Sequence, residues 1–448
     1  MSRKSRSAPV KPTATTSTDS QLRELVRQYR HILGECRADL LDRELAELSR
    51  KTYKRPLVLF FGRNTFTDNT KYLYLEAVRT LADYDVVWCT ANPALAAELT
   101  THGLPCLDMT ADPTLTTREL LQCSVAVFCE NMLSAFSFRP ALAGALAGAQ
   151  KLQLWHGISV KQLDLMLLPY GDVLDANFRQ TLLFASRPDV FLSTAACLDA
   201  FWVHAHGGRR LVRAGQPRNA VLLREATAHE RIGATLPGPL QRLLDDPATR
   251  CVLVAPTWKR GQGLFTSTAA FHDRLAAWAA ANDTVVFIKA HPFMTGADTP
   301  ATISGRLHVI DAGIDIYPSL ARFDALVTDL SSIMFDFLLT GKPIFTFEAA
   351  TQTHVFEPDW SLVPDTPFRY AFDERTMEAV LTTHLDTHTL AASQRVLASQ
   401  LYETDPLSAS ADLVRVIEAC HSAALDRPVD VIEMDPEPAE HHALSLAG

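Results

Sequence analysis

Two histidines of this sequence stand directly after segments that are expected to be β-strands. His156 follows the apolar run 151–155, and His291 follows the run 284–288. An imidazole has an ordinary pKa near ~6.5, so either ring could take or give a proton at neutral pH. Gly157, next to His156, would let the backbone approach a ligand closely. Each histidine could equally be a hydrogen-bonded structural residue.

Hydroxyl and basic side chains follow two other predicted strands. The run 325–328 leads through Thr328 and Asp329 to Ser331 and Ser332, which precede a predicted helix. The free N–H groups and the positive dipole end of a helix start favour a phosphate group, although a serine pair there could also be a plain N-cap. Three more side chains suited to phosphate follow the run 251–255: Thr257, Lys259 and Arg260. Together with the histidines, this pattern predicts a site for an anionic, phosphorylated ligand.

Familiar nucleotide-binding and metal-binding motifs are absent. The sequence contains no G-x-x-x-x-G-K-[ST] and no G-x-G-x-x-G after a predicted strand, which argues against ATPase and dinucleotide dehydrogenase chemistry. Asp83 and Asp85 precede a strand, so a solvated turn is favoured over a metal–nucleotide site. His204 and His206 lie two residues apart on a predicted helix, and we expect surface histidines rather than a metal pair. No metal site is predicted.

The candidate residues require sheets whose strand ends meet at one edge. After Pro56, short apolar runs alternate with longer segments of helical period, as in βαβ units. Ten strands are expected, at 57–61, 85–89, 124–128, 151–155, 189–193, 251–255, 284–288, 307–310, 325–328 and 343–347. The region 215–249 has several prolines and little strand character, which marks a boundary. The predicted fold class is α/β, with two doubly wound domains facing each other across a cleft.

Five segments are expected along the chain. They are a disordered basic tail at 1–20, a helical extension at 21–55, α/β domains at 56–215 and 216–425, and a loose acidic tail at 426–448. The first segment is rich in Ser, Thr and Pro, a composition that buries too little apolar surface to fold. The helical extension carries leucines among mixed charges, which favours packing on the first domain over binding at a membrane surface.

Composition limits the class of partner and the compartment. The formal net charge is −9, which disfavours nucleic acid as a partner. The eight cysteines form no C-x-x-C pair, which indicates a reducing compartment. The sequence has neither an apolar run of the ~18 residues that a membrane span needs nor a signal peptide. We expect a cytoplasmic location, with peripheral contact at the inner face of the membrane as the way to reach a lipid.

Six stretches of the sequence resemble, in the same order, the CDP-glycerol glycerophosphotransferases, a family that includes teichoic-acid and capsule polymerases. They are 68–74 (DNTKYLY), 155–157 (WHG), 215–219 (GQPRN), 255–258 (APTW), 289–292 (KAHP) and 328–343, of which the last is the most specific. The resemblance implies a GT-B fold with two Rossmann-like domains. It also implies that 56–215 binds the acceptor and that 216–425 binds the nucleotide donor.

The resemblance implies a transferase that moves a polyol phosphate, glycerol phosphate or a relative such as ribitol phosphate, from its CDP-activated form to a hydroxyl of a cell-surface polymer or its primer. CMP would be released, in teichoic-acid-like or capsule polysaccharide biosynthesis, without a required cofactor or metal. The implied partners are the CDP-linked donor, a polymer or lipid-linked acceptor, and the membrane or capsule assembly proteins. Two alternatives stay open: a GT-B glycosyltransferase that uses a nucleotide sugar, and a non-catalytic subunit of a capsule assembly complex.

The resemblance also assigns roles to the candidate residues. His156 would be the general base on the acceptor hydroxyl, and His291 would act on the donor pyrophosphate with Ser331 and Ser332. Other donor-binding residues are expected at Gly157, Thr257, Lys259, Arg260, Thr328 and Asp329. Acceptor or phosphate binding is expected at Asn69, Lys71 and Arg218.

Overall fold

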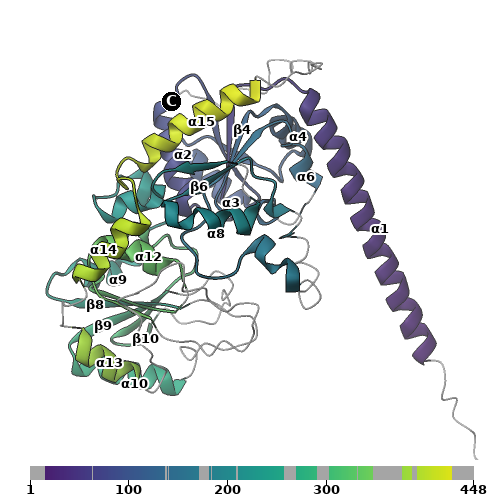
Figure 1. The fold of residues 1–448 in the computed structure, drawn as a ribbon. Coiled ribbons are helices and arrows are strands. Elements are labelled where there is room, and N and C mark those ends of the chain that lie inside the picture. The colour runs from purple at the N-terminus through teal and green to yellow at the C-terminus, as the bar shows by residue number, and fades with distance from the viewer. Residues whose placement is uncertain are drawn as a thin grey trace, which may run out of the picture.

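The computed structural model describes residues 16–425, except for 63, 137–138, 140, 171–180, 183, 208–209, 257–268, 290–301, 330, 347–375 and 386–390. The described residues form two α/β domains, each built on its own sheet, and Figure 1 shows one above the other. The predicted arrangement of two doubly wound sheets is confirmed. No helix in this part of the chain is long and apolar enough to cross a membrane.

The first sheet has seven parallel strands in the order β3-β2-β1-β4-β5-β6-β7. They are β1 (Leu57–Phe61), β2 (Asp85–Thr90), β3 (Cys106–Asp108), β4 (Val125–Phe128), β5 (Gln150–Gln153), β6 (Val190–Ser193) and β7 (Leu211–Arg213). Helices cover both faces of such a sheet, so its central strands are apolar along their whole length. Every residue of β1 and β4 is buried accordingly.

Helices and short 3₁₀ segments connect these strands. They are α2 (Asp68–Thr80), α3 (Pro93–Thr101), α4 (Pro113–Gln122), α5 (Met132–Ala135), α6 (Ala141–Gly144), η1 (Asp164–Tyr170), η2 (Ala196–Leu198) and α8 (Asp199–His206). The starts of α3 and α4 follow from local sequence, because Asn92 and Asp112 accept backbone N–H groups of the first turn. A proline follows each cap, at the position where its missing N–H costs nothing.

The second sheet has six strands in the order β10-β11-β9-β8-β12-β13, and only β10 runs antiparallel. They are β8 (Arg250–Ala255), β9 (Thr284–Lys289), β10 (Thr302–Ser304), β11 (Leu307–Ile310), β12 (Ala325–Thr328) and β13 (Ile344–Thr346). Its helical elements are α9 (Gly238–Asp245), α10 (Ala269–Ala281), α11 (Tyr317–Leu320), α12 (Ile333–Phe337), η7 (Leu338–Thr340), α13 (Met377–His384) and α14 (Ala391–Leu401). The 3₁₀ segments η3 (Pro217–Leu222) and η4 (His229–Arg231) connect the two domains.

The last helix, α15 (Ala409–Leu425), returns to the first domain. Figure 1 shows it beside α2, above the second domain. Leu413, Ile417 and Cys420 are buried in the same apolar cluster as residues of β1 and β4. The expected range of 216–425 for the second domain is therefore wrong for α15, because the apolar face of this helix is buried against the first sheet.

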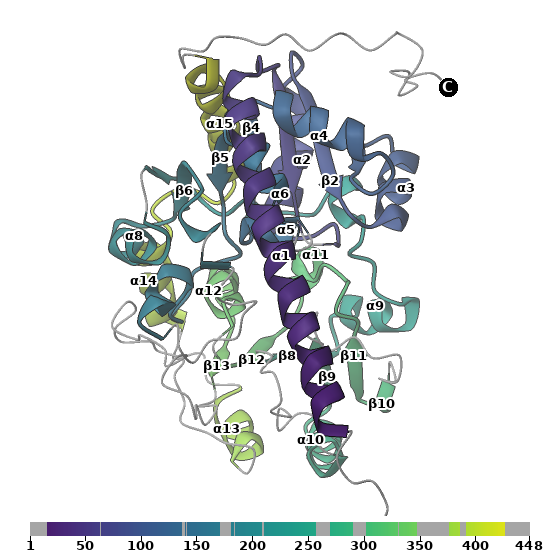
Figure 2. The same cartoon turned by 90° about the vertical axis from the view of Figure 1, so that its right-hand side faces the viewer.

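The N-terminal helix, α1 (Thr16–Lys51), begins earlier than the sequence predicts. Residues 16–20, assigned to a disordered tail, belong to this helix, and Ser, Thr and Asp side chains favour a helix start. Residues 1–15 lie outside the described part. Figures 1 and 2 show that one end of α1 lies against the first domain and that the other extends away from it. The Ser49 hydroxyl donates to the Ala145 carbonyl at 2.6 Å, and Arg187 pairs with Asp42 at 2.9 Å.

Candidate active site

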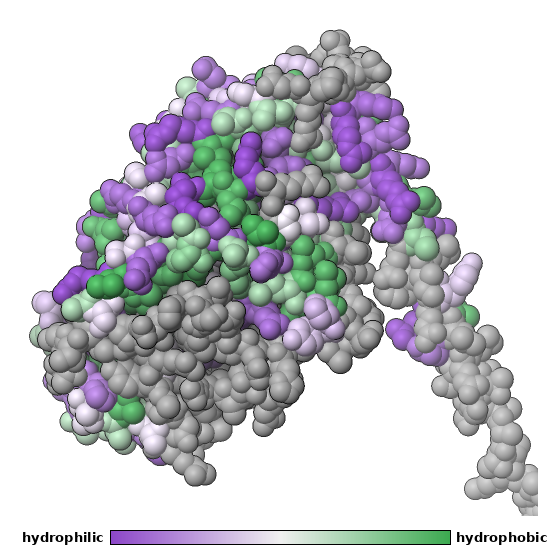
Figure 3. All heavy atoms as spheres, in the orientation of Figure 1, coloured by the Kyte–Doolittle hydropathy of each residue, from purple (hydrophilic) through white to green (hydrophobic). Residues whose placement is uncertain are grey.

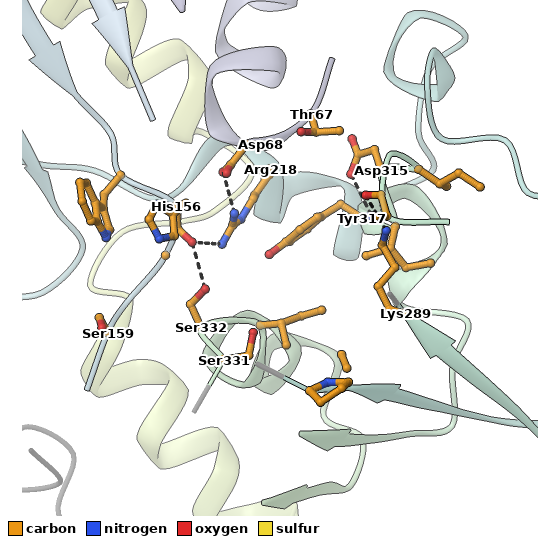
Figure 4. Close-up of a pocket in the computed structure, with 18 of the residues that line it drawn as sticks. Thr67, Asp68, His156, Ser159, Arg218, Lys289, Asp315, Tyr317, Ser331 and Ser332 are labelled. Atoms are coloured by element: carbon orange, nitrogen blue, oxygen red, sulfur yellow. Dashed lines mark hydrogen bonds and ion pairs between the residues drawn. The ribbon is translucent and has the colours of Figure 1, made fainter. Parts of the chain in front are cut away.

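A cavity of about 350 Å³ lies between the two domains, at the carboxyl ends of both sheets. The order of each sheet reverses direction where β1 meets β4 and where β8 meets β12, and ligands of such folds bind outside these points. Side chains from both domains point toward this space in Figure 4. The described residues that line it are Thr67, Asp68, Trp155, His156, Gly157, Ser159, Lys161, Leu163, Arg218, Ala255, Pro256, Lys289, Ala312, Ile314, Asp315, Ile316, Tyr317, Ser331, Ser332 and Ile333.

The loop after β5 carries His156 into this cavity. Trp155 and Gly157 have positive φ angles of 55° and 119°, which turn the chain sharply at the end of the strand. A Cβ atom on Gly157 would lie 2.7 Å from both Arg218 Nη2 and Ser332 Cβ, so only glycine fits here. Backbone strain of this kind persists where the surroundings enforce it, and it is frequent at active sites.

The His156 ring is oriented by two neighbours. It stacks on the Trp155 indole with the ring centroids 4.6 Å apart, and its Nδ1 lies 3.3 Å from the Cys129 carbonyl oxygen. A carbonyl only accepts hydrogen bonds, so Nδ1 is the donor in this contact, and in the neutral form of the ring the lone pair would lie on Nε2. The geometry therefore suits a base that acts through Nε2.

Ser332 connects the second domain to this loop. Its hydroxyl donates to the His156 carbonyl at 3.0 Å, as the dashed lines in Figure 4 show. It makes no side-chain cap bond to α12, and its backbone is already helical. The alternative that Ser332 is a plain N-cap is therefore wrong, because its hydroxyl reaches across the domain interface. Ser331 lies beside it on the cavity wall.

Arg218 lies in η3, where its buried guanidinium contacts both domains. Nη1 donates to Asp68 Oδ1 at 2.6 Å, while Nη2 donates to Asp336 Oδ2 at 2.7 Å and to the His156 carbonyl at 2.9 Å. The Tyr317 ring lies 4.4 Å from the guanidinium carbon. Burial acts to lower the pKa of Arg218, but the nearby carboxylates outweigh burial and raise it well above its ordinary value. Arg218 thus lines the cavity, but both terminal nitrogens already have protein acceptors.

Two candidates for phosphate binding have structural roles instead. All three N–H groups of the fully buried Lys71 ammonium are used, by the carbonyls of Glu230 and Ile232 and by Asp315 Oδ2 at 2.8 Å. Asn69 is also fully buried, and its amide donates to the Trp155 carbonyl at 2.9 Å. Neither residue is among the described residues that line the cavity, so their positions do not support the expected ligand contacts. Their polar groups hold the backbone and the domain interface.

Thr328 and Asp329, at the end of β12, are displaced from the expected site as well. The Thr328 hydroxyl donates to the Ala255 carbonyl at 2.6 Å and is fully buried between β12 and β8. Asp329 is 1% exposed and is not among the described residues that line the cavity. The predicted donor-binding roles are therefore not supported by the position of either side chain.

Four expected site residues lie outside the described residues: Thr257, Lys259, Arg260 and His291. Their roles stay predictions. Ala255 and Pro256, which precede the first three, reach the cavity wall. No group of three or more His, Cys, Asp or Glu side chains able to hold a metal ion occurs in the part of the chain that is described.

Sequence reasoning missed several residues of the cavity. Lys289 ends β9, and its ammonium donates to the carbonyls of Asp311 and Ala312 at 2.5 and 2.9 Å. Burial lowers the pKa of Lys289 to about 8, against the raising effect of Asp311 and Asp315. Its place in the stretch 289–292 was a signal that could have identified it. Asp315 lies in the loop after β11 and Tyr317 begins the short helix α11, and no spacing pattern in the sequence points to either residue.

His206 also differs from its expectation. It is buried rather than exposed, and it stacks on Phe191 with the ring centroids 4.4 Å apart. Its Nδ1 lies 3.3 Å from Asp164 Oδ2. The last turn of α8 packs its aromatic side toward the core, which the helical spacing of Trp202 and His206 could have indicated.

Comparison with known proteins matches this chain to one protein family. The family described as CDP-glycerol:poly(glycerophosphate) glycerophosphotransferase matches residues 45–355. A teichoic acid poly(glycerol phosphate) polymerase of Staphylococcus epidermidis is 22% identical over 352 residues, which are 73% of this chain and 45% of the relative. The teichoic acid ribitol-phosphate polymerase TarL of Staphylococcus aureus is 25% identical over 190 residues, which are 37% of this chain and 30% of the relative. The chain thus spans less than half the length of these curated relatives.

Solved structures agree on the fold. A structure of the wall teichoic acid polymerase TagF superposes with a TM-score of 0.64 and 18% identity, and covers 92% of this chain and 100% of that chain. The fold is GT-B, with two Rossmann-like domains. The family match extends over more than half of the sequence. The chain therefore belongs to the CDP-glycerol:poly(glycerophosphate) glycerophosphotransferase family.

Proposed function

We propose that this protein transfers a polyol phosphate from a CDP-activated donor to a hydroxyl of a cell-surface polymer or its primer, with release of CMP. One observation carries the proposal: His156 and the serine pair 331–332 meet at one cavity between the domains, joined by the 3.0 Å bond from Ser332 to the His156 carbonyl. A base on one wall and hydroxyl groups with a helix start on the other suit an acceptor hydroxyl that faces a pyrophosphate.

The reaction would begin when Nε2 of His156 takes the proton of the acceptor hydroxyl. The acceptor oxygen then forms a bond to the phosphorus of the polyol phosphate, and the bond from that phosphorus to the CMP oxygen breaks. Phosphoryl transfer of this kind depends mainly on alignment and on stabilisation of negative charge. Ser331, Ser332 and Lys289 line the same cavity, and we propose that they stabilise the departing CMP together with His291.

The relatives support the choice of donor class. One is described as a poly(glycerol phosphate) polymerase and another as a ribitol-phosphate polymerase, and TagF has been solved after a soak with CDPG. Because this chain spans less than half of those curated relatives, its donor, its acceptor and its place in teichoic-acid-like or capsule synthesis belong to the proposal. We infer either glycerol phosphate or ribitol phosphate as the transferred group.

The test is a product analysis with the full chain. The protein is incubated with CDP-glycerol, CDP-ribitol and a panel of nucleotide sugars, each with a short polyol-phosphate acceptor. The proposal expects CMP and an acceptor longer by one unit, and His156→Ala should lower turnover by ~100-fold or more while CDP binding persists. A nucleoside diphosphate as product would identify a glycosyltransferase. Absence of any product from all donors, with intact CDP binding, would favour a non-catalytic subunit.

We further infer that no metal ion is required and that the chain acts in the cytoplasm. Activity should persist in excess EDTA, and a strict dependence on Mg²⁺ would contradict this.

A lipid-linked acceptor would bring the protein to the inner face of the membrane. Deletion of residues 1–15, which carry four of the chain's basic side chains, should lower co-sedimentation with anionic vesicles at low salt. Unchanged sedimentation would assign membrane contact to another surface.

A further inference from the structure

Asp336 lies in α12 and is completely buried, yet its carboxylate accepts four hydrogen bonds. Oδ2 accepts from Arg218 Nη2 at 2.7 Å and from the Tyr317 hydroxyl at 2.6 Å. Oδ1 accepts from Asn219 Nδ2 at 3.1 Å and from the Tyr402 hydroxyl at 2.8 Å. All four acceptor directions of an ionised carboxylate are therefore used.

The donors come from separate parts of the fold. Arg218 and Asn219 belong to the connector segment η3, Tyr317 belongs to α11, and Tyr402 follows α14. Asp336 itself does not line the cavity. A buried carboxylate that joins this many elements is costly unless every lone pair is satisfied, so the site can exist only with these elements held together.

Through Arg218, this carboxylate is connected to the loop that carries the proposed base. The guanidinium nitrogen that binds Asp336 also donates to the His156 carbonyl at 2.9 Å. The same carbonyl accepts from Ser332, four residues before Asp336 in the chain. The backbone of His156 is therefore held at one atom by two donors, and the positions of both donors depend on the segment that contains α12.

We propose that Asp336 is a positioning residue, which fixes His156 through Arg218 without touching a substrate. The proposal rests on the function inferred above for His156. Asparagine at position 336 would keep the size of the side chain, but its amide would present N–H groups to two of the four donors and would remove the charge that holds Arg218. The His156 loop would then lose one of its two anchors. Misplacement of a reacting group by about 1 Å can cost ~100-fold in rate.

The experiment compares steady-state kinetics of Asp336→Asn with those of the intact chain. We expect kcat to fall by at least about tenfold, with the donor KM and the affinity for CDP within about threefold of wild type. Asp42→Asn is the matched control, because it breaks the partly buried pair with Arg187 away from the cavity. This control should leave kcat unchanged. Equal kcat in Asp336→Asn and wild type, with a lowered melting temperature, would overturn the proposal.

A double-mutant cycle tests the path through Arg218. Arg218→Lys keeps the charge but cannot reach three acceptors with one planar fork. If both residues act on His156 through one contact, the kcat of the double variant should lie within about threefold of the kcat of the slower single variant. If the fold-losses in kcat of the two single variants multiply in the double variant, the two residues have independent roles. Arg218→Lys also serves as the probe if Asp336→Asn does not fold.

A measurement without turnover separates this inference from the proposed function. In histidine-labelled protein, the His156 imidazole signal is assigned by its loss in His156→Asn. It should shift in Asp336→Asn and stay in place in Asp42→Asn. If wild-type protein releases no CMP from any donor, the proposed reaction fails, but a shifted His156 signal still supports the link. An unmoved signal would reject the link even in an active enzyme.

Discussion

Close contacts near His156 limit which side chains the neighbouring positions can accommodate. Gly157 lies at φ 119° with no room for a Cβ atom. Lys289 is half-buried, and its ammonium donates to two backbone carbonyls. The surroundings restrict the backbone conformation at Gly157 and the charge of the side chain at Lys289. We therefore expect substitutions at these two positions to have different effects on stability and activity.

Gly157→Ala should reduce both turnover and stability. A side chain with positive φ costs ~1–2 kcal/mol, and the added methyl group would collide with Arg218 and Ser332, which adds ~1–3 kcal/mol of overpacking. Gly103→Ala is the control, since Gly103 has φ 70° and nothing within 4 Å of its Cβ position. Urea unfolding and CMP release measure both effects. Similar losses in the two variants would mean that backbone strain, not collision with Arg218 and Ser332, is responsible.

Lys289 predicts the pH dependence of donor binding. Its pKa is lowered to about 8 by burial, so its ammonium charge is present at neutral pH and is lost as the pH rises through about 8. Affinity for CDP should fall between pH 7 and pH 9.5 in the wild-type protein. Lys289→Arg keeps its charge in this range, so its affinity should change less. Calorimetry at both pH values measures this, and parallel curves for the two proteins would contradict a role for Lys289.

The lowered pKa of Lys289 also makes the free energy of unfolding depend on pH. The pKa of Lys289 in the folded chain lies below its ordinary value of 10.5, so the unfolded chain binds more protons between these values. The free energy of unfolding should therefore gain from this group as the pH rises from about 8 to about 10.5. Below pH 8 the burial of the ammonium is a constant cost.

At the scale of elements, strands were predictable where apolar runs were continuous. The runs at 57–61, 307–310 and 325–328 match β1, β11 and β12 residue for residue. The three-residue strands β3, β7 and β10 were missed, since so short a run has no periodicity to detect. These short strands lie at edges of the two sheets, so missing them left the predicted arrangement intact.

The candidate site was predictable where it follows a strand or, as at Arg218, where a stretch that resembles the family marks it. His156, Ser331 and Ser332 were found because each lies just beyond a strand end, and all three line the cavity. Asn69 and Lys71 make buried contacts within the protein instead, and the sequence could not show this, because a polar side chain in a motif looks the same whether it binds a ligand or closes a domain interface. Asp336 was overlooked as a site residue because its four partners come from distant parts of the chain, and sequence spacing carries no record of them.

Helix α15 supplies a prediction about the first domain. Ile417 is completely buried against the first sheet, so Ile417→Ala should cost ~2–5 kcal/mol of unfolding free energy. Leu407→Ala is the control, since Leu407 is 51% exposed, and we expect a change within ~0.5 kcal/mol. Thermal unfolding measures both. An equally small effect at Ile417 would mean that α15 contributes little to the first domain.

For the molecule as a whole, buried ion pairs join the two domains. Lys71 of α2 pairs with Asp315 of the second domain at 2.8 Å, and the Tyr72 hydroxyl donates to the same carboxylate oxygen. Arg218 joins Asp68 of the first domain to Asp336 of the second. Buried ion pairs at an interface favour one relative position of the two domains, because any displacement leaves a buried charge unpaired.

Lys71→Met should therefore weaken the whole fold rather than the ligand site alone. It leaves Asp315 buried without its cation, and loss of one partner of a buried pair costs ~3–5 kcal/mol. Lys51→Met is the matched control, because Lys51 pairs with Glu47 on the exposed surface of α1, where such pairs contribute ~0–1 kcal/mol. Urea unfolding gives both values. If Lys71→Met is as stable as the wild-type protein but has lost its affinity for CDP, Lys71 binds the ligand after all.

The return of α15 to the first sheet also has a consequence during synthesis of the chain. About 200 residues separate the last strand of that sheet, β7, from the start of α15. At a translation rate of ~5–20 residues per second, the first sheet waits ~10–40 s on the ribosome for the helix that covers it. During this interval the surface that receives Leu413, Ile417 and Cys420 is open to water and to chaperones. We therefore expect the nascent first domain to expose this apolar surface until the second domain has been made.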